Sequence, residues 1–185
     1  MPTIAELGRL AAIQTVKQAS TALVRRIAKG LLSPQTVQRA AQAMPQGSFR
    51  FVKNLGRGQF SLADQVVGNI GGTAGQMVRK LPTHSNITPA SEYGPLKKII
   101  SHYNDRYRDA SGGNPIAPFL GVNNKGAFQA LAHEAVTPPK ALTDKLSDLH
   151  PGNFGPNGQI LDFGLSNSSS FKPILGDLLS FERQR

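Results

Sequence analysis

Three oxygen-bearing side chains fall within one short stretch near the end of the sequence. The segment SDLHPGNFGPNGQILDFG, residues 147–164, contains Asp148, Asn153 and Asp162. Carboxylate and amide oxygens suit Mg²⁺, and a further carboxylate can orient a hydroxyl that accepts a phosphoryl group. The pattern therefore predicts a site for phosphoryl transfer, in which Asp148 is the base, Asn153 a neutral metal ligand and Asp162 the charged metal ligand.

The residues between Asn153 and Asp162 must bring these two side chains together. They include Asn157-Gly158, which is the strongest short signal for a hairpin turn. We therefore expect the chain to reverse here and to return Asp162 to the side of Asn153, as a shared metal site requires.

The same segment resembles the catalytic loop and metal-binding motif of the protein-kinase-like fold. Its His-Pro-Gly-Asn portion is similar to the loop of atypical kinases, such as the coenzyme-Q-biosynthesis kinase-like family, and of small phage and bacterial kinase-like proteins. Ordinary protein kinases carry His-Arg-Asp where this sequence has Leu-Ser-Asp at 146–148, so Leu146 replaces the His. The interval from Asn153 to Asp162 is also shorter than in ordinary kinases.

A second segment resembles the glycine-rich loop that covers the phosphates of ATP in kinases. In NLGRGQFSLA, residues 54–63, Gly56 and Gly58 match the first two glycines and Ser61 replaces the third. Glycine suits such a loop because backbone N–H groups can approach phosphate without a Cβ in the way. Alone, this pattern is a weak signal.

The resemblance also implies a phosphate-binding lysine and an apolar adenine site. Lys80 matches the lysine of the third kinase strand, which binds the α- and β-phosphates, and Ala63 and Val78 are expected to line the adenine. In kinases this lysine pairs with an acid on the following helix. Asp105 is favoured for that role here, and Glu92 is the alternative.

A third segment, residues 114–136, resembles the fourth and fifth kinase strands and the hinge that follows them. On this resemblance His133 is the gatekeeper, and the backbones of Glu134 and Val136 hydrogen-bond adenine. The segments occur in the order that a kinase-like fold requires, from residue 54 to residue 164.

Hydrophobic periodicity and turn signals predict an α+β fold. Residues 1–47 are expected to form a basic helical extension, and residues 48–185 a minimal kinase-like domain whose β-sheet lobe carries one long helix. The expected elements are helices at 3–29, 33–44, 95–110 and 138–146, and strands within 48–81 and at 115–122 and 127–136. The strands within 48–81 are expected to be joined by hairpins at glycine-rich turns.

Little sequence is left for the second lobe of a kinase. Only eleven residues separate Val136 from Asp148, and 21 follow Gly164. We therefore expect a strongly reduced C-terminal lobe, so that the N-terminal helices or a partner protein must hold the catalytic loop.

The amino-acid composition excludes cysteine chemistry and limits the kinds of partner that the protein could bind. The sequence has 185 residues, no Cys and a net charge of +10, which excludes disulfides, thiolate zinc sites and thiol catalysis. Residues 1–54 contain eight Lys or Arg and a single acid, Glu6, and such a segment can meet nucleic acid, an anionic membrane or an acidic partner. The aromatic residues that base stacking uses are not interleaved with these charges, so nucleic acid is not favoured.

Together these features predict a minimal kinase-like phosphotransferase that binds ATP and Mg²⁺, with an acceptor that the sequence does not identify. The alternative is a non-catalytic pseudokinase that serves as an interaction or structural component of a larger assembly, such as a phage particle. A protein partner or oligomer contact through the N-terminal helices is expected in either case. Without a membrane-spanning run or a secretory signal, a cytoplasmic location is expected, which means the host cytoplasm or the virion if a phage encodes it.

Overall fold

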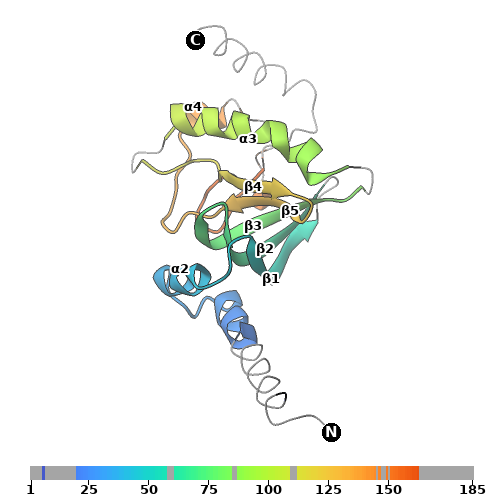
Figure 1. Ribbon diagram of the computed structural model, residues 1–185. Coiled ribbons are helices and arrows are strands. Elements are labelled where there is room, and N and C mark those ends of the chain that lie inside the picture. The colour runs from blue at the N-terminus through green and yellow to red at the C-terminus, as the bar shows by residue number, and fades with distance from the viewer. Residues whose placement is uncertain are drawn as a thin grey trace.

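The described residues form one β-sheet with helices packed against it (Figure 1). The computed structural model describes residues 6, 20–57, 61–84, 87–108, 112–144, 146, 149 and 151–162. The predicted α+β class is confirmed. The elements are α2 (Pro34–Gln42), β1 (Ser48–Arg57), β2 (Ser61–Ile70), β3 (Thr73–Pro82), α3 (Pro89–Arg106), β4 (Phe119–Asn123), β5 (Gly126–Ala130), α4 (Lys140–Thr143) and the 3₁₀ turn η1 (Pro151–Asn153).

The five described strands form one sheet in the order β1-β2-β3-β5-β4, with every neighbouring pair antiparallel. The chain leaves the sheet after β3, forms α3, and returns through β4 to place β5 next to β3. Figure 1 shows α3 beside β4 and β5, whereas α2 lies toward the part of the sheet formed by β1, β2 and β3.

A two-residue turn joins β2 to β3 and fixes their register. Ile70 pairs with Thr73, and Gly71 and Gly72 between them have φ values of 58° and 80°. Glycine is needed because L-residues with a side chain rarely adopt positive φ at both central positions of a turn. This turn confirms the hairpin that the glycine-rich sequence predicted.

Capping residues set where the two main helices begin. Ser33 accepts a hydrogen bond from the backbone N–H of Thr36, and Pro34 follows as the first residue of α2. Thr88 and Ser91 form a capping box at the start of α3. This helix therefore begins six residues before the predicted start at 95 and ends at 106 rather than 110. Within the described residues, no helix combines the length and apolar character needed to cross a bilayer.

Long-range pairing also shifts the later elements from their predicted positions. The strands expected at 115–122 and 127–136 are β4 at 119–123 and β5 at 126–130. The pairing of β5 with β3 ends at Ala130, which lies opposite Met77. The helix expected at 138–146 is reduced to α4 at 140–143. Periodicity located these elements, whereas pairing with β3 set the end of β5.

The N-terminal helical segment packs onto the chain's own sheet. Residues 20–28 are helical, and Ile27 is buried in one cluster with Val37 of α2. The sheet contributes Val52 and Val67 to the same cluster, in which all four residues are at most 8% exposed. The apolar side of these helices is therefore used within the molecule.

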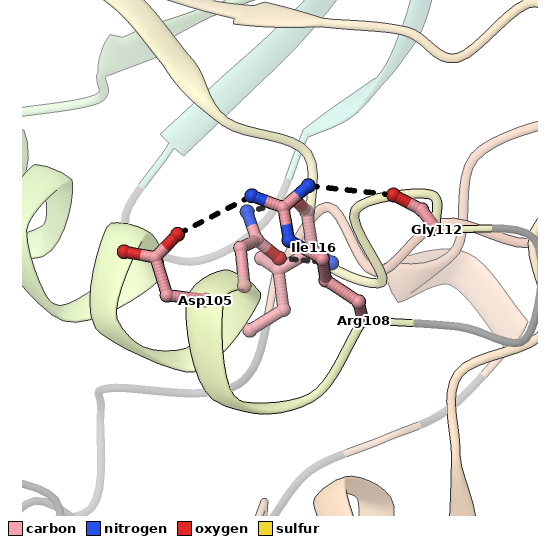
Figure 2. A network of polar contacts seen from close by, with 5 residues as sticks. Asp105, Arg108, Gly112 and Ile116 are labelled. Carbon is pink, nitrogen blue, oxygen red and sulfur yellow. Dashed lines mark hydrogen bonds and ion pairs between the residues drawn. The ribbon is translucent and has the colours of Figure 1, made fainter.

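Polar contacts fix the connection between α3 and β4 (Figure 2). The buried Asn104 side chain donates a hydrogen bond to the carbonyl of Ile116 at 2.8 Å and accepts one from its N–H at 3.0 Å. Nearby, the exposed Arg108 guanidinium contacts the Asp105 carboxylate at 3.4 Å and the Gly112 carbonyl at 3.4 Å. The Asn104 contacts hold the segment that precedes β4 against the helix.

Candidate functional site

The amine of Lys80 is buried beside Asp162, the one carboxylate among the described residues that line the cavity. Lys80 lies on β3 and is 5% exposed. Its Nζ donates a hydrogen bond to the Leu161 carbonyl at 2.6 Å and forms an ion pair with Asp162 Oδ2 at 3.1 Å. A buried ammonium requires such partners because removing it from water without compensation is costly. The Asp162 side chain is 44% exposed and so remains accessible.

The loop that carries Asp162 reverses direction as the sequence predicted. Phe154 and Ile160 form an antiparallel bridge, and the N–H groups of Gly155 and Gly158 donate to the carbonyls of Gln159 and Gly155 at 2.7 and 3.0 Å. A separate pair of bonds closes the loop: the N–H groups of Leu161 and Asp162 donate to the Asn153 carbonyl at 2.7 and 3.3 Å. Asp162 is therefore held next to Asn153.

Gly158 fastens this loop to the segment that follows β5. It has a φ of 83°, and a Cβ at this position would collide with the carbonyl oxygen of Val136. The adjacent Asn157 carbonyl accepts a hydrogen bond from the Val136 N–H at 2.7 Å. The backbone of Gly158 is therefore in direct contact with the backbone of Val136. Only glycine permits this contact, because any other residue has a Cβ.

Lys80 and Asp162 face a cavity of about 810 Å³. Among the described residues, the charged groups of its lining are three cations, Lys53, Arg57 and Lys80, and one carboxylate, Asp162. This imbalance favours an anionic ligand. Several residues that were predicted from the sequence as site residues also line this cavity: Gly56, Ser61, Ala63, Val78, Lys80, Asn153 and Asp162.

Two of the predicted site residues, Asp148 and Gly58, lie outside the described residues. Asp105 is described, and its position corrects the predicted pairing with Lys80. Its carboxylate is on the exposed side of α3 next to Arg108 (Figure 2), and the carboxylate that pairs with Lys80 is that of Asp162. The alternative residue, Glu92, also lies in α3.

The predicted adenine contacts of Glu134 and Val136 also need correction. Val136 is buried and its N–H is already bonded to the Asn157 carbonyl. Glu134 is exposed and does not line the cavity. Because β5 ends at Ala130, the cavity is instead lined by the three residues that come next, Leu131, Ala132 and His133.

Sequence reasoning missed several residues of the cavity. Gln65 of β2 and Gln76 of β3 face it, and so do Lys53 and Arg57 of β1. The two-residue alternation along β2 and β3 places Gln65 with Ala63 and Gln76 with Val78, so strand periodicity was a usable signal. The helical segment 20–28 contributes Ile27, and no sequence signal predicted that contact.

Neither a metal cluster nor a known relative identifies the site. Among the described residues, no group of three or more His, Asp or Glu side chains is arranged to hold a metal ion. Comparison with protein-family models, curated proteins and solved structures found no match to this chain.

Proposed function

We propose that this protein is a kinase-like phosphotransferase that binds ATP and Mg²⁺ in the cavity beside Lys80. The observation that carries the proposal is the buried Lys80 amine, which meets Asp162 at 3.1 Å at the wall of an 810 Å³ cavity. A lysine on the third strand and an acid after a tight reversal are the groups that kinases use for phosphate and metal. The cavity lies within the size range of about 300–1,000 Å³ that small-molecule sites have.

The residues present fit such a ligand. The ammonium of Lys80 and the guanidinium of Arg57 supply positive charge for phosphates, and Gly56 leaves the backbone of β1 open to close approach. Ala63 and Val78 form an apolar wall for an aromatic ring. The ligand would therefore lie with its anionic end at Lys80 and its ring along the sheet.

The oxygens for Mg²⁺ would come from Asp162 and Asn153, which the loop reversal holds together. Bound Mg²⁺ would neutralise charge on the transferred phosphoryl group. Asp148, which follows the described Leu146 in sequence by two residues, would orient the hydroxyl of the acceptor. Lys80 would bind the phosphates and position them near Asp162, which would hold the Mg²⁺.

The test is the thermal stabilisation of the protein by ATP, measured with Mg²⁺ and with EDTA. At 100 times its Kd a ligand stabilises the folded state by about 2.7 kcal/mol, which corresponds to a rise of about 5–10 °C in Tm for a chain of this length. Wild type should show this rise with Mg²⁺ and a smaller one with EDTA. Asp162→Ala should lose the increment due to Mg²⁺.

Asp105→Ala is the matched control, since it removes an exposed carboxylate that lies outside the cavity. It should respond to Mg²⁺ as wild type does. Equal shifts for wild type and Asp162→Ala in both conditions would reject the proposed site. Stabilisation by ATP without any turnover of ATP would reject the transferase and support the non-catalytic alternative.

A further inference from the structure

Two glutamine side chains form a pair in the wall of the cavity, beyond its apolar part. Gln65 lies on β2 and Gln76 on β3, at diagonal positions in the register of these strands. The Gln65 Nε2 donates a hydrogen bond to the Gln76 Oε1. Both residues line the cavity, and Gln65 is only 8% exposed. Gln76 is half-buried, and neither amide is among the buried polar groups that lack a partner, so the remaining polar groups of the pair are accessible from the cavity.

Each amide has one polar group left over for a ligand. Within the described part of the chain, the Gln65 Oε1 accepts no hydrogen bond and the Gln76 Nε2 donates none. Because the two amides are joined to each other, one neighbouring acceptor and one neighbouring donor remain. Such a pair matches a ring edge that carries an acceptor beside a donor.

The position of the pair relative to Lys80 suits the far edge of a nucleobase. Gln76, Val78 and Lys80 occupy alternate positions of β3, and all three line the cavity. At roughly 3.4 Å per residue, Gln76 is about 14 Å along the strand from Lys80. A ligand whose phosphates reach Lys80 and whose ring lies against Val78 would bring the outer edge of that ring to Gln76.

Three backbone N–H groups of the segment after β5 are already hydrogen-bonded within the protein. The N–H of Leu131 donates to the Gln76 carbonyl at 3.3 Å, and the N–H of Ala132 donates to the Gln159 side chain at 2.7 Å. Val136 is bonded to the Asn157 carbonyl. These three N–H groups of the segment after β5 are therefore not available to a ligand.

We propose that Gln65 and Gln76 bind the polar edge of the nucleobase and determine which base this protein accepts. The class of ligand is a nucleoside triphosphate whose base carries adjacent donor and acceptor groups, as adenine does with its 6-amino group and N1. This inference rests on the proposed nucleotide site and adds its specificity.

The experiment measures Kd by calorimetry in Mg²⁺ for three ligands: ATP, purine riboside triphosphate, which lacks the 6-amino group, and inorganic tripolyphosphate. The variants are Gln65→Met and Gln76→Met, singly and together, because Met keeps the length of the side chain and removes its hydrogen-bonding groups. Gln42→Met, at an exposed position of α2 outside the cavity, is the matched control. Thermal unfolding of each variant verifies that it is folded.

Wild type should bind ATP about tenfold more tightly than purine riboside triphosphate, since one hydrogen bond in a desolvated site contributes up to about this factor. The double variant should bind ATP about tenfold more weakly, should lose most of the discrimination, and should bind tripolyphosphate within about twofold of wild type. The Gln42 variant should match wild type for all three ligands.

The outcomes separate the two proposals. If the double variant binds ATP as tightly as wild type does, the role of the glutamines is overturned and the nucleotide site stands. The same holds if the affinities of the double variant for ATP and for tripolyphosphate fall by the same factor. If wild type does not distinguish ATP from purine riboside triphosphate, the base-reading role is likewise overturned. If wild type binds none of the three ligands, the proposed nucleotide site fails and the inference fails with it.

Discussion

Replacing Gly158 by Ala tests the contact that fastens the loop of Asp162 to the rest of the protein. The new methyl group would collide with the carbonyl oxygen of Val136, and the φ of 83° is unfavourable for any residue with a Cβ. The loop can relieve the collision only by moving away from Val136. That movement breaks the hydrogen bond of 2.7 Å from the Val136 N–H to the Asn157 carbonyl.

The expected cost has two parts. A left-handed backbone conformation costs a residue with a side chain about 1–2 kcal/mol. Loss of the bond to Val136 adds about 0.5–1.5 kcal/mol, and more if its buried N–H stays without a partner. Gly158→Ala should therefore lower the free energy of unfolding by about 2–4 kcal/mol, which is a fall of about 4–16 °C in Tm.

Gly72→Ala is the matched control. Gly72 has a φ of 80°, and a Cβ there would meet nothing within 4 Å. This variant has the backbone strain alone and should cost about 1–2 kcal/mol. Urea denaturation of both variants gives the two free energies under the same conditions. A loss for Gly158→Ala no larger than that for Gly72→Ala would refute the role of the Val136 contact.

Urea denaturation of three further variants compares how much other contacts contribute to the free energy of unfolding. Asn104→Ala should lower the free energy of unfolding by about 2–4 kcal/mol, because it leaves the N–H and carbonyl of Ile116 without partners in the interior. Asp64→Ala should cost about 3 kcal/mol, since it removes the buried carboxylate that pairs with Arg79. Lys140→Ala removes only an exposed ion pair and should change stability by less than about 1 kcal/mol. A loss for the last variant as large as that for Asn104→Ala would contradict this ranking.

Features set by neighbouring residues were predictable from the sequence. The reversal at Asn157-Gly158, the turn at 71–72 and the Ser33-Pro34 helix start are confirmed, because each depends on the conformational preferences of the residues that form it. Lys80 lies on the third strand, which is the position that the resemblance to kinases implied. The chemical roles of Lys80, Asn153 and Asp162 remain predictions.

Features set by distant contacts were not predictable. The carboxylate partner of Lys80 was expected on the following helix, but Asp105 faces solvent there and Asp162 reaches Lys80 through the loop reversal. The segment that lines the cavity after β5 was placed too late in the sequence, because the end of β5 depends on its pairing with β3. Local sequence around Val136 carries no sign that its N–H is bonded to Asn157.

The N-terminal helices were expected to bind a partner protein, and their packing limits how they can do so. Ile27 and Val37 are buried against Val52 and Val67 of the sheet, so the described apolar side of these helices is already covered. Their exposed side carries cations, among them Arg25, Arg26, Lys29 and Arg39. Any partner of the segment 20–42 would therefore meet positive charge, which favours an acidic surface. Because Ile27 and Pro34 also line the cavity, such a contact would lie next to the candidate site.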